Sequence, residues 1–241
     1  VDVSKPGGSV PVHRVRFVDW SPSAITALAL SPVAWTESAA AGRSVLAIGR
    51  DNGNIDLCTW CEGQSGSIAQ GWSPVWTLLG EENYKIESLA FTASASHLRL
   101  FSTSGGSIVS EHFLPSSLTG QQAADTRTPT RTLSSHGGAI WSMAASPTGK
   151  FLAIGCEDGV VRLIDVAGDA FEHVGTGMHV APRMTRVASR ILSLAWGPPR
   201  RQMATSNDSD DDDDEAWRDT YLLGGLGNST AAVWDVPTLS L

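Results

Sequence analysis

The stretch IWSMAASPTGKFLAIGCEDGVVRLIDV, which runs from Ile140 to Val166, decides the fold of this chain. It contains three short runs in which apolar residues alternate with small or polar ones, and a half-buried β-strand requires this period of two. The runs are separated by the segment SPTG and by the pair Asp158-Gly159, and residues of these types form tight turns. The stretch therefore predicts three consecutive antiparallel strands.

The same pattern occurs four times along the 241 residues. Ile25, Ile86, Ile140 and Ile191 open the four units, and these openings are 61, 54 and 51 positions apart. A fourth strand is expected in each of the first three units, at residues 75–79, 127–133 and 171–174. Helical periodicity is almost absent, so groups of short strands at this spacing predict an all-β fold built of β-propeller blades.

The third unit resembles a WD repeat most closely. His136 stands at the histidine of that pattern, Asp158 at the turn aspartate, and Ile164-Asp165 at the Trp-Asp pair that names the repeat. In this family the histidine, the turn aspartate and the tryptophan form a structural hydrogen-bonded network with a Ser or Thr on a strand. Cys156 replaces that Ser or Thr here, so we expect an incomplete network.

The other units depart from the WD pattern to different degrees. The fourth keeps the pair Trp234-Asp235, whereas the first has Cys58 and the second has Glu111 at the tryptophan position. Taken together, the four units predict a WD40-type β-propeller of which four repeats are visible.

The four units are expected to form part of a larger ring. We assign the blades to residues 25–79, 86–133, 140–174 and 191–241, after a tail over 1–12 and a separate strand over 13–20. WD rings usually have seven blades, which need about 300 residues, so we expect the chain to be an N-terminal part of a longer protein. Within the separate strand, His13 to Val18 alternates like a β-strand, and we expect it to complete the last blade beyond Leu241.

The negative charge of the chain is concentrated in one short segment. Asp208, the run Asp210–Asp214 and Glu215 supply seven of the formal charge of −8, which leaves −1 for the rest of the chain. These residues lie in an acidic insert over 204–219. The balance excludes a strongly basic nucleic-acid-binding domain, although it allows a local basic patch.

Composition and spacing exclude several other classes of protein. No apolar run approaches the 18 residues of a membrane-spanning helix, and the N-terminus has no secretory signal. Three scattered cysteines favour a reducing compartment over a disulfide framework. The pair Cys58 and Cys61 lacks the second pair of ligands that a zinc site needs, and the chain has no catalytic motif. We therefore expect no enzymatic activity, cofactor, metal or small-molecule substrate.

The run IWSMAAS with GCEDG, the segment SRILSLAW and the opening HRVRFVDWSPSAITALA make this chain similar to the cirhin family. The resemblance covers residues 12–236 and is strongest between His136 and Val166. Members are U3 small nucleolar RNA-associated WD-repeat proteins of the small-subunit processome, with two tandem propellers and a C-terminal segment. The long inserts and the absent C-terminal part are departures from the family pattern.

The resemblance implies a non-catalytic scaffold in the nucleolus. Such a protein belongs to the UtpA (t-UTP) subcomplex, which acts in early small-subunit ribosome assembly. Its expected partners are other WD-repeat processome proteins and the 5′ external transcribed spacer of pre-rRNA. The alternative is a substrate-recognition adaptor of the ubiquitin-ligase or chromatin-reader type, because such WD modules hold ligands with arginines or an aromatic cage.

Two groups of residues are candidates for regulated or electrostatic binding. Five arginines flank the entry strand of the fourth unit, where convergence on one rim would create a contact for an RNA backbone or a partner: Arg183, Arg186, Arg190, Arg200 and Arg201. Ser209 precedes three aspartates, a context that an acidophilic kinase prefers, and its phosphorylation would add about −1.5 to −2 charge. The alternative for the arginines is a solvated loop that pairs with the acidic insert. The alternative for the acidic insert is a spacer with no electrostatic role.

Overall fold

A computed structural model describes nine segments of the chain: residues 23–32, 44–61, 71–80, 84–93, 98–114, 131–174, 184–201, 217–238 and 240–241. All regular structure in these segments is β-strand. They contain no helix of the length and apolarity needed to span a membrane. The all-β fold class predicted from the sequence is confirmed.

The strands form four consecutive antiparallel sheets, which we call blades 1 to 4. Blade 1 contains β1 (Ile25–Leu30), β2 (Val45–Arg50), β3 (Ile55–Cys61) and β4 (Gly71–Leu78). Blade 2 contains β5 (Ser88–Ala93), β6 (Leu98–Thr103), β7 (Ile108–Phe113) and β8 (Arg131–Ser134). Blade 3 contains β9 (Ile140–Ala145), β10 (Phe151–Cys156), β11 (Val161–Asp165) and β12 (Glu172–His173). Blade 4 contains β13 (Ile191–Trp196), β16 (Tyr221–Leu226) and β17 (Ala231–Asp235).

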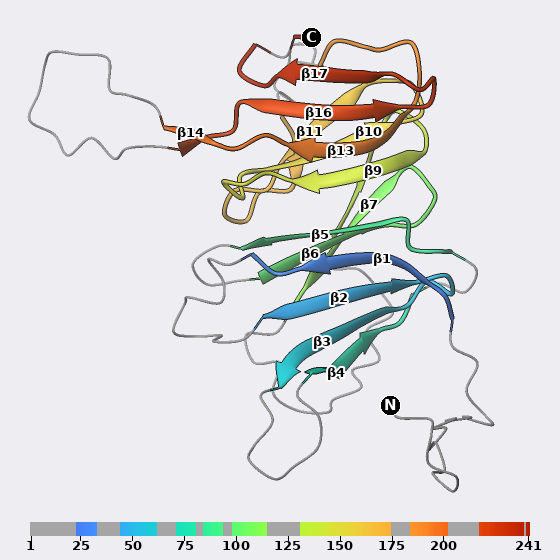
Figure 1. Cartoon of the computed structure of the whole chain (residues 1–241). Helices are drawn as coiled ribbons and strands as arrows, with labels where there is room; N and C mark the ends of the chain where they lie inside the picture. Colours follow the sequence, from blue (N-terminus) through green and yellow to red (C-terminus); the bar gives the residue numbers. More distant parts are fainter. Residues whose placement is uncertain are drawn as a thin grey trace, which may run out of the picture.

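The fourth blade differs from the others. Its described part has three strands, and a single bridge between Asp235 and Ser240 follows the last of them. A separate two-stranded hairpin of β14 (Arg200–Arg201) and β15 (Trp217–Arg218) leaves the blade between β13 and β16. The acidic insert interrupts the blade here, and its hairpin projects away from the sheets (Figure 1).

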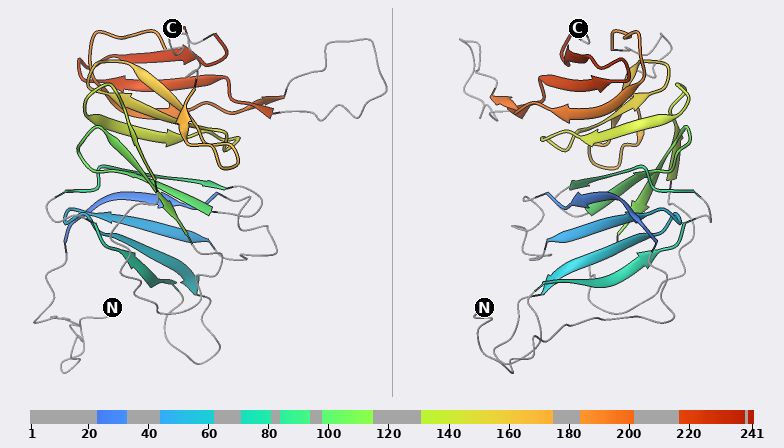
Figure 2. Two further views of the ribbon diagram at one scale, coloured as in Figure 1. Left: turned by 180° about the vertical axis from the view of Figure 1, so that it is seen from behind. Right: turned by 45° about the vertical axis from the view of Figure 1, so that its right-hand side comes forward.

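The blades are arranged radially, with their first strands on the inside. The first strands β1, β5, β9 and β13 contact one another in that order along the chain. From these inner strands the sheets fan outward, with blade 1 and blade 4 at the two ends of an arc (Figures 1 and 2). This order follows from the repeat, because each unit covers the one before it.

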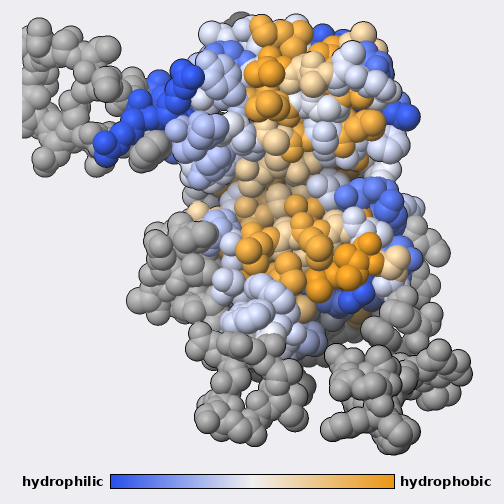
Figure 3. Space-filling view, viewed as in Figure 1, coloured by the Kyte–Doolittle hydropathy of each residue, from blue (hydrophilic) through white to orange (hydrophobic). Residues whose placement is uncertain are grey.

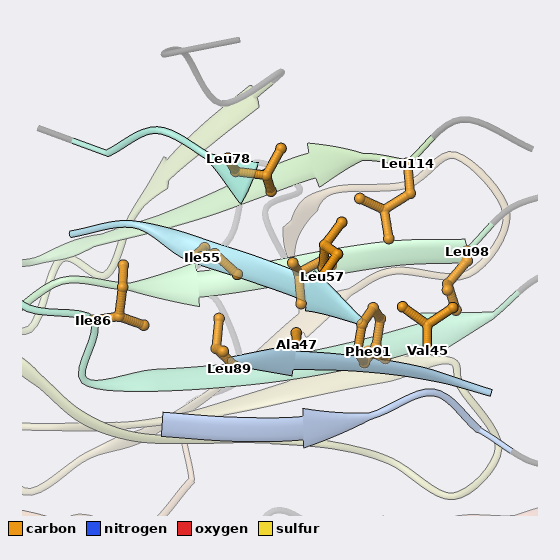
Figure 4. Close-up of a cluster of buried hydrophobic side chains, with 11 residues drawn as sticks. Val45, Ala47, Ile55, Leu57, Leu78, Ile86, Leu89, Phe91, Leu98 and Leu114 are labelled. Carbon is orange, nitrogen blue, oxygen red and sulfur yellow. The ribbon is translucent and has the colours of Figure 1, made fainter. Parts of the chain in front are cut away.

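Alternation along the strands sends successive side chains to opposite neighbours. In β10, Leu152 and Ile154 pack in the cluster between blades 2 and 3, whereas Ala153 packs in the cluster between blades 3 and 4. A third cluster fills the space between blades 1 and 2, with Leu57 and Phe91 from opposite sides (Figure 4). The core therefore consists of three separate layers between blades.

The two rims of the arc differ in the length of their connections. The turns 51–54, 104–107, 157–160 and 227–230 define the compact rim, together with the linkers between blades. Five long segments lengthen the repeats, and we call them inserts. At the opposite rim, the insert rim, the described residues flank four of them: 33–43, 61–71, 116–125 and 197–219. The remaining insert, 177–189, joins blade 3 to blade 4 at the compact rim.

A buried ion cluster joins blade 2 to blade 3 near the insert rim. The Glu111 carboxylate is fully buried and pairs with Arg99 and Arg131 at 2.5 Å each. The remaining Arg99 donors bind three carbonyl oxygens in the segment after β11, at distances of 2.7 to 2.8 Å: Val166, Gly168 and Ala170. Because every charge in this cluster has several partners, its desolvation is compensated.

Replacing Glu111 with alanine is expected to lower the free energy of unfolding by about 3–5 kcal/mol, because two guanidinium groups lose their buried partner. Urea unfolding followed by tryptophan fluorescence measures this loss. The control is Glu87→Ala, which breaks a partly exposed pair with Lys85 and should cost less than about 1 kcal/mol. Equal losses in the two variants would contradict the role assigned to the buried cluster.

Candidate functional site

The WD-network position of blade 3 contains an arginine that the sequence pattern did not indicate. Arg162 is largely buried, and its Nη1 and Nη2 donate to the two oxygens of the Asp158 carboxylate at 3.0 and 2.7 Å. Nη2 also donates to the His136 carbonyl at 3.1 Å. Burial alone would raise the pKa of Asp158, but its hydrogen bond from Arg162 holds that pKa below the usual value. The guanidinium lies so close to Gly137 that a Cβ there would approach Arg162 Nη1 to 2.2 Å.

His136 contributes its backbone to this network rather than its ring. It has a positive φ of 52°, and its ring packs against His173 at 5.5 Å between centroids. Cys156 is fully buried nearby, and burial raises the pKa of its thiol to about 11, so the thiol remains protonated. Arg162 therefore connects the turn and the linker in place of the usual histidine side chain.

The remaining WD positions act locally. Asp165 accepts a hydrogen bond from the backbone N–H of Ala167, and Asp235 accepts two from Thr238. Trp234 is fully buried between blades 3 and 4 and donates its indole N–H to the Thr185 carbonyl at 3.0 Å. These residues cap turns and fill an interface between blades.

The strand register places His112, and not Glu111, at the tryptophan position of blade 2. In blade 2, Leu100 pairs with Phe91 of the first strand on one side and with His112 on the other. In blade 3, Leu152 pairs in the same way with Ala145 and Ile164. The assignment of Glu111 to that position was wrong by one residue, and Glu111 points to blade 3 instead. The alternation of β7 is ambiguous in the sequence because Ser110, Glu111 and His112 are all polar.

Burial of the His112 ring makes the stability of the chain depend on pH. Desolvation lowers its pKa from 6.5 to about 4, although the charge of Glu111 opposes the shift. Between pH 6.5 and 4 the unfolded chain binds a proton at this position that the folded chain does not bind. The stability that the neutral His112 ring contributes is therefore fully present above pH 6.5 and is lost as the pH falls towards 4.

We expect the unfolding free energy to decrease by up to about 3 kcal/mol over this range through His112. In His112→Gln this part of the pH dependence should disappear. Urea unfolding at pH 7, 5.5 and 4.5 measures both proteins. The same pH slope in the variant would show that other groups are responsible.

The candidate arginines do not converge on one rim. Arg186 and Arg190 lie at the compact rim just before β13, whereas Arg200 and Arg201 lie in β14, beyond the other end of that strand. The six residues of β13 separate the two groups by roughly 20 Å. Arg183 lies outside the described residues.

The group near the compact rim is engaged with its neighbours. The Arg190 guanidinium lies 4.9 Å from the centre of the Trp141 ring, and the Trp141 indole donates to Glu157. Arg186 lies in a shallow pocket with Glu157 and Asp158. Acidic side chains therefore offset the positive charge here, which makes this group a poor contact for phosphate.

The hairpin at the insert rim carries a third arginine that the sequence pattern did not indicate. Arg218 pairs with Arg200 across the two strands, and Arg201 is adjacent to it in the register. All three are exposed, and Arg200 lies 4.9 Å from the centre of the Tyr221 ring. A sequence signal did exist, since basic residues lie on both sides of the acidic run 208–215. This basic hairpin is the stronger candidate for contact with a phosphate backbone.

Both end blades have an uncovered apolar face. Leu28 in β1 is 60% exposed, and Val233 in β17 is 49% exposed. Further exposed apolar residues lie on the inner strands or beside them: Ile25, Leu30, Leu192 and Leu223. Figure 3 shows the two patches on one side of the arc, over blade 1 and over blade 4. Such patches are typical of surfaces that bind another protein unit.

Other candidates cannot be placed in the structure. Ser209 and the acidic run 208–215, as well as the strand expected at His13–Val18, lie outside the described residues.

Cys58 is buried and burial raises the pKa of its thiol. Within the described segments, no group of three or more His, Cys, Asp or Glu side chains could hold a metal ion.

Comparisons with known proteins agree with this fold. The family model of the WD domain, G-beta repeat, matches residues 127–165, which extend from just before β8 to the end of β11. A crystal structure of the computationally designed Ika4 protein is similar in fold, with a TM-score of 0.50 and 17% identity over 94% of this chain and 99% of that chain.

Sequence relatives cover almost the whole chain. U3 small nucleolar RNA-associated protein 4 of Schizosaccharomyces pombe is 31% identical over 94% of this chain and 26% of its own length. The Saccharomyces cerevisiae protein of that name is 30% identical over 92% of this chain and 23% of its own length, and the Mus musculus homolog is 30% identical over 83% and 24%. The chain spans about a quarter of the length of these relatives. It is thus a WD-repeat β-propeller chain with homologues named U3 small nucleolar RNA-associated protein 4.

Proposed function

We propose that this chain is part of a non-enzymatic nucleolar scaffold in early small-subunit ribosome assembly. The observation that carries the proposal is the homology with U3 small nucleolar RNA-associated proteins over 94% of the chain. The geometry supports it, because four of the five inserts lie at one rim and apolar faces are uncovered at both ends. The partners would be other WD-repeat proteins of the processome, in particular the UtpA (t-UTP) subcomplex that the cirhin resemblance implies.

The uncovered faces of blades 1 and 4 support a longer ring. Each layer between two blades is built of apolar side chains from both sides. The relatives are about four times as long as the region that this chain matches. Further blades of the same polypeptide would cover Leu28 and Leu223, and a seven-bladed ring remains our expectation.

A charge placed on these faces distinguishes covered from open blades. In the 241-residue chain, Leu28→Asp and Leu223→Asp should change the melting temperature little, because both side chains are exposed. In the full-length protein each change should lower it by several degrees, because a carboxylate would be buried in an apolar layer. Asn52→Asp in an exposed turn is the matched control. Equally small effects in both proteins would argue against further blades at these faces.

The basic hairpin supplies the RNA contact in this proposal. Its arginines project from the insert rim, where no acidic group of the described residues pairs with Arg200 or Arg218 within salt-bridge distance. The acidic insert joins the ends of this hairpin and would compete with RNA for it, more strongly after phosphorylation at Ser209. In this proposal, the acidic insert and its phosphorylation regulate RNA binding at the insert rim.

Purification of the tagged full-length protein from cells tests the scaffold function. Co-purification of WD-repeat processome proteins and pre-rRNA is expected, whereas a single peptide ligand would favour the adaptor alternative. One observation supports that alternative, since Trp141 of the inner strand β9 forms an aromatic and cationic pair with Arg190.

The RNA contact is measured separately with single-stranded RNA from the 5′ external transcribed spacer. Replacing Arg200 and Arg218 with glutamine should reduce the salt slope by about 0.7 for each phosphate that the protein no longer neutralises. Replacing Arg186 and Arg190 should leave the slope unchanged. Replacing the seven acidic residues with Ser and Gly should increase RNA affinity, and unchanged affinity would mean that the insert is only a spacer.

A further inference from the structure

A cavity of about 370 Å³ lies between blades 1 and 2 at the compact rim. Its volume falls within the range of sites that bind small ligands or single side chains. Aliphatic residues and small hydroxyl groups line it, and two of its apolar residues, Tyr84 and Ile108, are exposed. The blade 1 side contributes Ile55 and Leu78, which Figure 4 shows at one end of the apolar cluster.

The cavity exists because blade 2 has a residue smaller than tryptophan at its tryptophan position and small side chains around it. Strand register makes three sets of residues equivalent: Phe91, Leu100 and His112 in blade 2, Ala145, Leu152 and Ile164 in blade 3, and Trp196, Leu222 and Trp234 in blade 4. In blade 4 the Trp234 ring extends over Gly224, where a Cβ would come within 2.7 Å of it. His112 is too small to fill the corresponding space.

Three serines enlarge the same space. Register pairs Leu89, Ser102 and Ser110 in blade 2 as it pairs Met143, Ile154 and Arg162 in blade 3. Two residues after Ser102 in blade 2 and Ile154 in blade 3, Ser104 corresponds to Cys156. In blade 3 the larger side chains at these positions fill the layer towards blade 2, whereas the serines of blade 2 leave it open.

The lining of the cavity is mainly apolar, with a few polar groups and no charged side chain. His112 is held neutral by burial, and its Nε2 forms a hydrogen bond of 2.9 Å with the Ser102 hydroxyl. Lys85 and Glu87 pair with each other outside the lining. The Ser104, Ser110 and Thr132 hydroxyl groups remain as hydrogen-bond partners for an occupant. These features favour an uncharged, flat, apolar group with one polar atom.

We propose that the cavity between blades 1 and 2 binds a tryptophan side chain of a partner polypeptide. The fold itself contains the precedent, because Trp234 occupies the equivalent layer between blades 3 and 4 and donates its indole N–H to a linker carbonyl. The linker that leads to blade 2 contributes Gly80 and Tyr84 to the cavity. The inference rests on the proposed scaffold function only in taking the occupant to be part of a protein.

The probe is N-acetyl-5-fluorotryptophan amide, observed by fluorine NMR so that the nine native tryptophans do not contribute. With the 241-residue chain we expect a dissociation constant between about 0.1 and 1 mM, as is typical of a ligand of this size. The amide of N-acetyl-trifluoroleucine should bind at least about tenfold more weakly, because it lacks the flat ring and the N–H donor.

Two variants close the cavity in different ways. His112→Trp places the blade 4 residue in blade 2, and it should abolish binding of the probe and raise the melting temperature by about 2–4 °C through cavity filling. Gly106→Phe extends a ring over the cavity from an exposed position, where a new Cβ meets only the Ser104 carbonyl at 4.0 Å. The matched control is Gly71→Phe on β4, where a Cβ meets no atom within 4 Å.

Abolished binding in both closing variants, with binding retained in Gly71→Phe, supports the proposal. Absence of binding to the unmodified chain overturns it, as does equal affinity for the leucine probe. Retained binding in Gly106→Phe also overturns it, even if His112→Trp fails to fold. None of these results depends on co-purification with the processome, so failure of the cavity and failure of the scaffold function are distinguishable.

Discussion

Packing between neighbouring blades is the constraint on which the rest of this structure depends. Each sheet is apolar on both faces, so each needs a neighbour on both sides to keep its side chains from water. Alternation along a strand such as β10 meets this need by sending Leu152 and Ala153 to different neighbours. The same constraint explains the two exposed patches, because blades 1 and 4 have only one neighbour each among the described residues.

The layers between blades are filled by different side chains, and the residue at the tryptophan position largely determines how well each layer is filled. Trp234 fills its layer with a single large ring, whereas Ile164 fills less and is assisted by the side chains around it. On the other face of blade 2, the buried Glu111 binds two arginines and so holds a segment of blade 3 in place. His112 is surrounded by serines instead of larger side chains, and the layer between blades 1 and 2 therefore retains a cavity.

The two rims differ in what they contribute to the structure. The compact rim has a short turn in each blade, held by hydrogen bonds such as those of the Asp158–Arg162 pair, and the cavity between blades 1 and 2 lies there. Inserts at the insert rim leave the inner layers undisturbed, because they begin and end where strands already end. The basic hairpin is the clearest example, since β14 and β15 carry three arginines outward without contributing to any sheet of the blades.

Much of the fold could be predicted from the sequence by itself, because the period of two and the Gly- or Asn-bearing turns depend only on local backbone preferences. Those signals determined the all-β class, the repeat and the approximate strands around Ile140 and Ile191. Only the tertiary structure decided that His112 rather than Glu111 faces blade 1, that Arg162 connects His136 and Asp158, and that the arginines lie at opposite ends of β13. The reason is that each of these depends on which strand pairs with which residue, and on what the next blade places opposite, and neither is encoded in local periodicity.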